Sequence, residues 1–354
     1  MIQPRVHVIY EHGIDPRPFG SAQIRLLRPL SHPVLRDQFE VTFDWTYRGE
    51  LADVVIVDRL WRPDVSLPSA EQLLQDVRRA GARFVYAIDD DFLSLSEEAA
   101  PGYFNAAKRS VVELWLREAD QVVVTTLPLQ QRVLPFNPRC VIVPNALDER
   151  LLIGERPRSL ETPFGPRPTV IGYMGTYSHE ADWRLILPAW RQVYERHREA
   201  VEFQVIGISE RAQALARQAG VPVRVIHPRL EEVEYPLFML WFTGQIRWDI
   251  AVAPLLDTPF TRCKSDLKFL DYSSLGAATI ASRVPVYESS VRHGETGWLA
   301  ENTVEAWTNA VEQFVTDDET RTTMAQAARC YLWHARILEQ CGQAWAGALK
   351  TCRN

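Results

Sequence analysis

The chain has 354 residues, of which 46% are hydrophobic and 24% charged, and its formal net charge is −6 at pH 7. A chain of this length is expected to form two domains, and this composition is typical of soluble globular proteins. The negative charge argues against nucleic acid as a partner, but it is compatible with a local basic patch for an anionic ligand.

The cysteine count and the apolar runs predict a cytoplasmic protein. The chain has five cysteines, an odd number, without a CxxC or Cys/His metal-binding spacing, which favours a reducing compartment. The N-terminal apolar run at residues 5–10 is too short for a signal peptide. No apolar stretch approaches the ~20 residues that span a bilayer, so any membrane contact would be peripheral.

The first part of the chain alternates short apolar runs with helical segments. This alternation predicts a parallel sheet covered by helices on both faces. Strands are expected at residues 5–10, 41–45, 52–58, 83–89, 121–126 and 140–145, and helices at 21–31, 67–81 and 111–119.

A proline-rich segment at 154–169 reads as a hinge, and a second alternation begins after it. Strands are expected there at 169–175, 201–208, 221–228, 246–255 and 279–282, and helices at 181–199, 210–219 and 265–276, with final helices at 303–315, 317–330 and 331–350. The predicted architecture is α/β, with two Rossmann-like doubly wound domains at 1–160 and 161–334. Ligands of such domains bind at the carboxyl ends of the strands, here in the cleft that the two domains face.

Residues 259–299 carry the most informative pattern of the chain. Ser265 is a candidate N-cap and Gly276 a candidate C-cap of a helix. Lys264, Lys268 and Asp271 follow at steps of four and three, so we expect them to share one helical face. Two cations at a helix start can hold a diphosphate, and a carboxylate one turn later can bind sugar hydroxyls. The pattern favours a nucleotide-sugar site over a surface helix with solvated lysines.

Asp89, Asp90 and Asp91 end the predicted strand at 83–89, and three adjacent carboxylates need compensation by cations, hydrogen bonds or water. Three interpretations remain open: acceptor binding in the cleft, a DxD-type site for Mn²⁺ or Mg²⁺, or an exposed helix N-terminal cap.

Gly172, Gly175 and Thr176 lie where the strand at 169–175 ends and before the helix at 181–199, and a phosphate could approach the backbone there. A tight turn is an equally good interpretation. The loop is not the G-x-G-x-x-G dinucleotide motif, and no acidic residue follows at the expected spacing, which argues against a dehydrogenase.

The segments FLDYSSLGAATIAS and HGETGWLA resemble the donor-binding region of retaining glycosyltransferases of the GT-B type, the group that includes sucrose synthases and bacterial mannosyltransferases. VIVPNALD (141–148) resembles the end of that family's first domain, and VIGYMGTYS (170–178) the first strand and glycine loop of its second. The resemblance covers roughly the C-terminal two-thirds of the chain. It implies a hexosyltransferase-like enzyme that moves a sugar from a nucleotide diphosphate sugar to a hydroxyl acceptor with retention, in polysaccharide or glycoconjugate synthesis, without a cofactor or an essential metal.

The resemblance also implies roles for residues. The catalytic candidates are Lys264, Lys268, Asp89 and Asp90, the last two in place of a histidine that this family often has beside the transferred sugar. The donor-binding candidates are Gly175, Thr176, Arg262, Ser265, Asp271, Glu288 and Glu295. His12, Gly13 and Arg25 are acceptor-side candidates, because the loop after the first strand faces the cleft in GT-B enzymes. The last helix, about 335–354, is expected to pack back on the first domain.

The chain departs from the family pattern in two places. The family's two glutamates are replaced by Cys263 and Asp271, and its Arg and Lys after the first strand of the second domain by Thr176 and Ala181. Arg262, Lys264 and Lys268 are therefore the candidates for neutralising the diphosphate. These departures leave an alternative function, a catalytically inactive nucleotide-sugar-binding protein that acts as a partner subunit.

Overall fold

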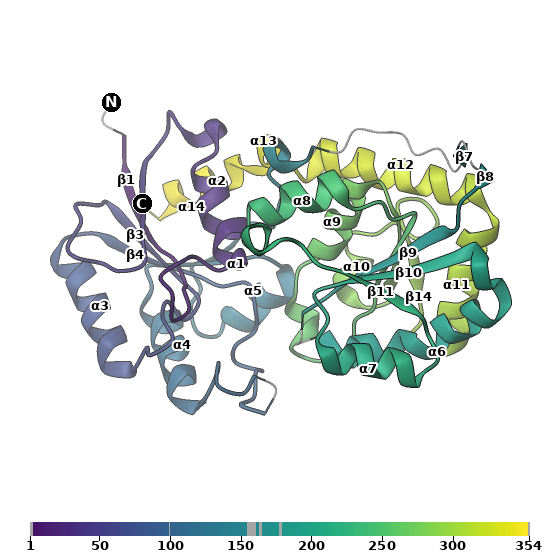
Figure 1. Ribbon diagram of the computed structural model, residues 1–354. Coiled ribbons are helices and arrows are strands. Elements are labelled where there is room, and N and C mark those ends of the chain that lie inside the picture. The colour runs from purple at the N-terminus through teal and green to yellow at the C-terminus, as the bar shows by residue number, and fades with distance from the viewer. Residues whose placement is uncertain (1–2, 99, 154–160, 163–164, 177–178, 353–354) are drawn as a thin grey trace. The chain divides into compact units, whose positions relative to one another are not determined.

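The computed structural model describes residues 3–98, 100–153, 161–162, 165–176 and 179–352. The chain forms two compact units, and each contains a parallel sheet between helices (Figure 1). Unit 1 comprises Met1–Glu149, Arg262–Ser265 and Arg336–Asn354, and unit 2 comprises Arg150–Thr261 and Asp266–Ala335. The first division therefore falls after residue 149, earlier than the expected 160. Most of the predicted hinge at 154–169 lies outside the described residues.

The sheet of unit 1 has the strand order β2-β1-β3-β4-β5-β6, and all its pairings are parallel. The chain runs from β1 outward to β2 and then returns to β3 on the other side of β1. The carboxyl ends of β1 and β3 therefore form the topological switch point of this sheet. The strands are β1 (Arg5–Ile9), β2 (Glu40–Asp44), β3 (Val54–Asp58), β4 (Arg83–Ala87), β5 (Gln121–Val124) and β6 (Cys140–Ile142).

Helices cover both faces of this sheet (Figure 1). A π-helical turn, η1, joins α1 to α2 where the sequence predicts one continuous helix. Ser66 caps α3, and Ser69 completes the capping box three residues later. The helices are α1 (Gly20–Ala22), η1 (Gln23–Leu27), α2 (Arg28–Leu30), α3 (Leu67–Arg79), α4 (Ala106–Glu118), α5 (Leu127–Val133), α13 (Leu338–Cys341) and α14 (Gln343–Thr351), with 3₁₀ turns η2 (Pro33–Leu35) and η3 (Glu149–Leu151).

The end of the chain belongs to the core of unit 1. Trp345 and Leu349 of α14 are buried among apolar side chains of β1, β3 and β4. Gln121 Nε2 donates to the carbonyl of Ala348 at 2.9 Å. The expected single helix at 331–350 is wrong in detail, because α12 continues to Ala335 and two shorter helices follow.

The sheet of unit 2 is also six-stranded and fully parallel, with the order β11-β10-β9-β12-β13-β14, so here two strands lie outward of the first one. Its switch point lies between β9 and β12. The strands are β9 (Thr169–Met174), β10 (Val201–Ile206), β11 (Val223–Ile226), β12 (Ile250–Ala253), β13 (Ala278–Ser282) and β14 (Trp298–Ala300). The helices are α6 (Glu180–His197), α7 (Glu210–Gln218), α8 (Leu237–Gln245), α9 (Leu267–Leu275), α10 (Pro285–Glu288), α11 (Val304–Thr316) and α12 (Asp318–Ala335), with 3₁₀ turns at 198–200, 230–232 and 261–263.

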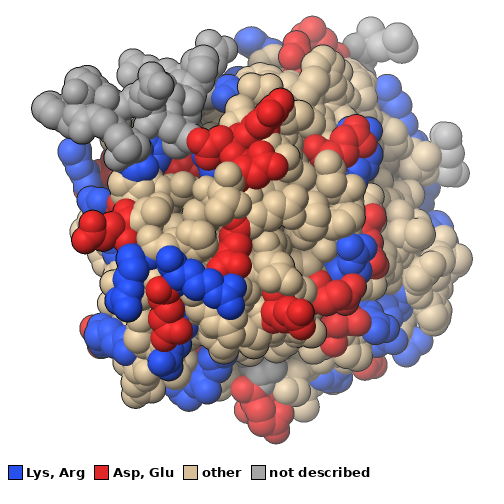
Figure 2. Space-filling model, turned by 90° about the vertical axis from the view of Figure 1, so that its right-hand side faces the viewer, with Lys and Arg blue, Asp and Glu red and all other residues tan. Residues whose placement is uncertain are grey.

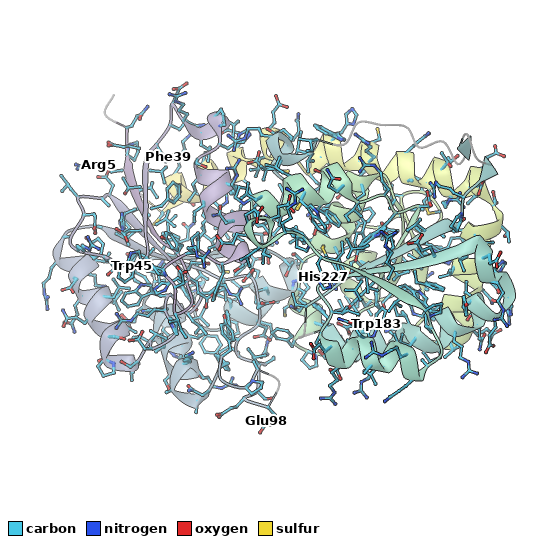
Figure 3. All side chains as sticks on the ribbon, in the orientation of Figure 1. Arg5, Phe39, Trp45, Glu98, Trp183 and His227 are labelled. Atoms are coloured by element: carbon cyan, nitrogen blue, oxygen red, sulfur yellow. The ribbon has the colours of Figure 1, made fainter. Side chains whose placement is uncertain are left out.

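Aromatic rings fill one side of the unit 2 core. Trp183, labelled in Figure 3, stacks on Tyr173 with ring centroids 5.0 Å apart, and Trp190 stacks on Phe203 at 4.5 Å. Gly172 leaves the room that the Trp248 indole occupies, since a Cβ there would lie 1.8 Å from that ring. This explains the first glycine of the predicted loop by packing.

The surface charge and the hydropathy of the helices concern two expected partners, nucleic acid and a membrane. Figure 2 shows basic and acidic side chains interspersed on one face of the molecule, without a broad region of a single sign. That face is unlike the basic surfaces that bind nucleic acid. None of the helices among the described residues is both long and apolar enough to cross a membrane.

Candidate functional site

The carboxyl edge of the unit 1 sheet collects charged side chains at its switch point. Glu11 and His12 follow β1, Asp58 ends β3 and Arg59 follows it, and the aspartate trio follows β4. Because parallel strands end at the same edge, residues far apart in the sequence meet here.

Arg59 is the centre of this cluster. Its Nε lies 3.2 Å from Glu11 Oε2 and 3.4 Å from Asp89 Oδ1, and its Nη2 donates to Asp90 Oδ2 at 3.4 Å. Tyr103 accepts from Arg59 Nη2 at 3.0 Å and donates to Glu11 Oε1 at 2.8 Å. Arg59 has φ of 45°, a left-handed conformation that is strained for a side chain of this size and that often occurs at functional sites.

Burial sets the protonation of the cluster. Desolvation raises the pKa of Glu11, while Arg59 and the Tyr103 hydrogen bond oppose the shift. Desolvation also raises the pKa of Asp58 to about 7, helped by the nearby carboxylates of Glu11 and Asp89. Burial lowers the pKa of Arg25, and the charges of Asp89 and Asp58 oppose it. The edge therefore holds several ionisable groups at close range, some buried and some partly exposed to water.

Each aspartate of the trio contacts a cation from the protein. Asp89 and Asp90 contact Arg59, Asp90 Oδ1 also lies 3.1 Å from Lys264 Nζ, and Asp91 Oδ2 lies 3.2 Å from Arg132 Nε. Asp91 also accepts from Ser94 Oγ and the Leu93 amide, so it organises the following turn. The protein's own cations therefore compensate the charges of all three carboxylates. Among the described residues, ligand atoms suited to a metal converge at His32, Asp148 and Glu149, not at the trio.

Lys264 does not lie on α9, the helix predicted at 265–276, so the prediction that Lys264, Lys268 and Asp271 share one helical face is wrong. The α9 helix begins at Leu267 with Asp266 as its N-cap. Ser265, the predicted N-cap, instead accepts from Asn145 Nδ2 at 2.8 Å, and Thr126 Oγ1 donates to the Cys263 carbonyl at 2.9 Å. These two bonds fix residues 263–265 within unit 1, and Arg262 lies in the preceding 3₁₀ turn. Gly276 ends α9 with φ of 67°, as predicted.

Lys268 and Asp271 do lie together on α9, in unit 2. Lys268 Nζ is 5.2 Å from the centroid of the Tyr173 ring, a cation–π distance. Asp271 is buried, and desolvation raises its pKa to about 7, while Lys268 opposes the shift. Tyr272, the next residue, accepts from the Met174 amide at 3.1 Å and joins α9 to the end of β9.

The glycine loop of unit 2 follows β9 at the switch point of that sheet. A Cβ on Gly175 would lie 2.4 Å from the Tyr173 hydroxyl, so this position requires glycine. Thr176 is exposed beside it. The loop and Lys268 thus share Tyr173 as a neighbour.

Glu288 and Glu295 are placed less favourably. Glu288 is exposed at the end of α10. Glu295 lies in the turn before β14, and Trp298 at the start of β14 pairs with Ile280 in the middle of β13. This turn is therefore near the amino end of the strands, where Glu295 pairs with Arg292 at 3.1 Å. The structure does not bring Glu295 to the edge that carries Gly175.

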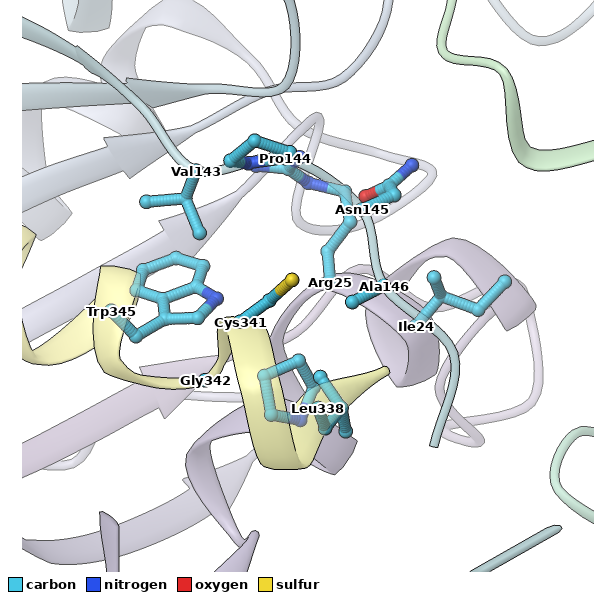
Figure 4. A pocket seen from close by; sticks show the side chains of 11 residues that line it. Ile24, Arg25, Val143, Pro144, Asn145, Ala146, Leu338, Cys341, Gly342 and Trp345 are labelled. Atoms are coloured by element: carbon cyan, nitrogen blue, oxygen red, sulfur yellow. The ribbon is translucent and has the colours of Figure 1, made fainter. Parts of the chain in front are cut away.

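The acceptor-side candidates lie at the carboxyl edge of unit 1. His12 Nδ1 donates to the Gly13 carbonyl at 2.6 Å, and the His12 ring meets the Trp45 indole edge to face at 5.5 Å. Arg25 lies in η1 and is 3% exposed. Figure 4 shows Arg25 with Asn145 and Trp345 around a small pocket of unit 1, which is mostly apolar.

Four residues of the unit 1 cluster are absent from the sequence predictions: Glu11, Asp58, Arg59 and Tyr103. Asp58 and Arg59 directly follow a predicted buried strand, the same signal that singles out Asp89. Tyr103 lies between elements and has no such signal.

Comparison with known proteins finds a family match that lies in unit 2. A family model described as Glycosyl transferases group 1 matches residues 168–317. This segment of the chain is similar to group 1 glycosyl transferases. The match covers most of unit 2, including the glycine loop and α9, so the resemblance inferred from these segments is confirmed. No curated protein matched the chain.

Solved structures with the GT-B fold are similar to the whole chain. HepE from Anabaena, in complex with UDP and glucose, has a TM-score of 0.68 at 14% identity, covering 99% of this chain and 100% of its own. Sucrose-phosphate synthase from Thermosynechococcus elongatus has a TM-score of 0.70 at 14% identity, covering 99% of both chains. TarM from S. aureus has a TM-score of 0.63 at 12% identity, and the chain covers 57% of the length of TarM. The protein has the GT-B fold of two Rossmann-like doubly wound units, as predicted.

Proposed function

We propose that the protein transfers a sugar from a nucleotide diphosphate sugar to a hydroxyl acceptor, with retention at the anomeric carbon. The group 1 match carries this proposal, because it falls on the unit whose switch-point loop and α9 hold the donor candidates. The HepE structure with UDP-glucose supports a UDP-hexose as the first donor class to test. A cytoplasmic role in polysaccharide or glycoconjugate synthesis accompanies the proposal.

On the donor side, cations stabilise the leaving diphosphate. Lys268, with Lys264 and Arg262, supplies positive charge where negative charge develops as the bond between the anomeric carbon and the phosphate oxygen breaks. Gly175 and Thr176 let the backbone approach the phosphates, and Asp271 binds ribose hydroxyls. In this proposal the reaction needs no cofactor and no essential metal.

On the acceptor side, Asp89 and Asp90 accept hydrogen bonds from the acceptor hydroxyls. Arg59 holds both carboxylates in place. The acceptor oxygen forms the new bond to the anomeric carbon on the face that the phosphate leaves, and the hydroxyl proton passes to the departing phosphate oxygen. Retention follows from this same-face exchange.

One observation favours a second candidate, a donor-binding protein without transfer activity. Cys263 occupies the place of the family's first glutamate, and burial raises the pKa of its thiol to about 12. A neutral thiol cannot replace a carboxylate in binding sugar hydroxyls. Such a protein would bind the donor as a partner subunit.

The test is release of nucleotide diphosphate from UDP-, GDP-, ADP- and dTDP-sugars, measured with EDTA and with magnesium. We expect turnover with one donor class that persists in EDTA, and a loss of about 10²-fold or more in Lys268→Ala. Lys350→Ala, an exposed lysine of α14, is the matched control and should retain full activity. Binding without turnover would support the second candidate, and absence of binding to every nucleotide would contradict both.

A further inference from the structure

Exposed aromatic side chains stand beside the charged cluster of unit 1. Trp45 follows β2 and is 41% exposed, and Phe19, at the end of the loop after β1, is 37% exposed. Figure 3 labels Trp45 on the ribbon of unit 1. Large aromatic residues are expensive to leave in water, so their exposure at a ligand-binding edge indicates a binding surface.

Hydrogen bonds hold this aromatic surface in place. Trp61 Nε1 donates to the Trp45 carbonyl at 2.8 Å, and the His12 amide donates to the Trp61 carbonyl at 3.0 Å. The Phe19 amide donates to the Glu11 carbonyl at 3.1 Å, and a Cβ on Gly13 would lie 3.3 Å from the Phe19 ring. Hydrogen bonds thus connect the loops after β1, β2 and β3 into one surface.

Two adjacent residues connect the aromatic surface to the carboxylates. Glu11 contacts Arg59, which holds Asp89 and Asp90, while His12 contacts the Trp45 indole. His12 is 8% exposed, and its Nδ1 donates to the Gly13 carbonyl, so in the neutral imidazole its Nε2 is the acceptor. Within the described part of the chain, that Nε2 has no hydrogen-bond partner. An unsatisfied buried nitrogen beside the indole points to a ligand that donates a hydrogen bond.

We propose that the acceptor is a carbohydrate whose ring stacks on Trp45. A sugar ring has an apolar C–H face, which suits an aromatic plane, and hydroxyls at its rim, which suit His12 Nε2, Asp89 and Asp90. This inference rests on the proposed transferase function and specifies the class of its acceptor. An aliphatic alcohol lacks the flat face and would use Trp45 poorly.

Fluorine NMR of fluorotryptophan-labelled protein tests the stacking without relying on activity. Trp45→Phe assigns the Trp45 signal by its disappearance. Methyl glucoside, maltotriose and chitotriose are the carbohydrate probes, and hexanediol is the acyclic control. We expect at least one saccharide to shift the Trp45 signal in a saturable way, with no effect of hexanediol. A shift with hexanediol alone, or no shift with any saccharide, would overturn the proposal.

Kinetics separate this inference from the proposed function. In Trp45→Ala we expect the KM for a saccharide acceptor to rise about tenfold, with kcat and hydrolysis of the donor by water nearly unchanged. Leu51→Ala, which truncates an exposed residue of the same β2–β3 connection, should leave KM unchanged. Equal KM values in Trp45→Ala and wild type would overturn the carbohydrate surface while donor hydrolysis persists. Loss of donor hydrolysis from the wild type would instead count against the transferase function.

Discussion

At the scale of single residues, Arg59 has the largest structural role in the unit 1 cluster. It contacts Glu11, Asp89, Asp90 and Tyr103, and its side chain is only 13% exposed. Removing one partner of a buried ionic cluster leaves carboxylates without compensation, which is a far larger loss than that of a surface ion pair.

We therefore predict that Arg59→Ala lowers the free energy of unfolding by about 3–5 kcal/mol, and that Arg59→Lys has an intermediate effect because it keeps the charge without the planar fork. Denaturant titration measures both. Arg48→Ala removes an exposed arginine of the same unit and is the control. An equal effect of Arg59→Ala and Arg48→Ala would show that the cluster is not held by Arg59.

Asp271 gives a prediction about pH. Its pKa in the folded protein is about 7, above the ordinary aspartate value of 3.8. Between these two pH values the folded protein binds more protons than the unfolded chain. The contribution of Asp271 to stability therefore falls as pH rises through this window. The free energy of unfolding of Asp271→Asn, measured relative to that of the wild type, should therefore rise by about 2 kcal/mol from about pH 5 to about pH 8. Thermal unfolding at both pH values measures this gain, and a constant difference between the two proteins would contradict the assignment.

The residues of the site differ in how far the sequence could predict them. Asp89 and Asp90 stand out because adjacent carboxylates at a strand end are visible in the sequence. The partners of these aspartates are Arg59, which follows β3, and Lys264, which follows β12, and only the folded chain brings these segments together. Arg59 also stands at a strand end, but one charged residue there is a weaker signal than three adjacent carboxylates.

At the scale of elements, the start of α9 shows why helix caps are hard to place. Ser265 and Asp266 are both good N-cap types. Tertiary contacts decide between them, because Asn145 takes the Ser265 hydroxyl and the Asp266 carbonyl accepts from the Phe269 amide at 2.9 Å. Lys264 precedes both candidate caps, so it lies outside the helix, directly after the 3₁₀ turn at 261–263.

The central strand β9 depends on the absence of a side chain at Gly172. We predict that Gly172→Ala destabilises the protein by about 3 kcal/mol or more, because the new methyl group would overlap the Trp248 ring. Gly347→Ala on α14 is the matched control, since its Cβ meets nothing within 4 Å and alanine favours helix by up to about 1 kcal/mol. Denaturant titration of both variants checks the prediction, and equal stabilities would contradict the packing.

At the scale of the whole molecule, alternating strands and helices predict both doubly wound sheets, because burial on both faces leaves continuous apolar runs. The sequence does not predict as well which segments belong to which unit. Residues 262–265 and 336–354 belong to unit 1 although they follow most of unit 2 in the sequence, and long-range contacts alone define this arrangement.

The packing of the C-terminal residues 336–354 in unit 1 leads to a prediction at the scale of the whole molecule. Trp345 is 3% exposed in the core of unit 1, so Trp345→Ala should destabilise that unit by about 3–5 kcal/mol. Lys350→Ala on the same helix should have little effect. Hydrogen exchange followed by mass spectrometry should show faster exchange in β1 and β3 and unchanged exchange in β10 and β12. Equal acceleration in both sheets would contradict a core confined to unit 1.

The central claim is that this GT-B protein binds a nucleotide diphosphate sugar through Lys268. Calorimetric titration of UDP, GDP, ADP and dTDP in EDTA, into wild type and Lys268→Ala, tests it most directly. The account predicts that one nucleotide binds the wild type and that Lys268→Ala binds it about tenfold or more weakly. Equal affinity in the two proteins, or no binding of any nucleotide to the wild type, would contradict it.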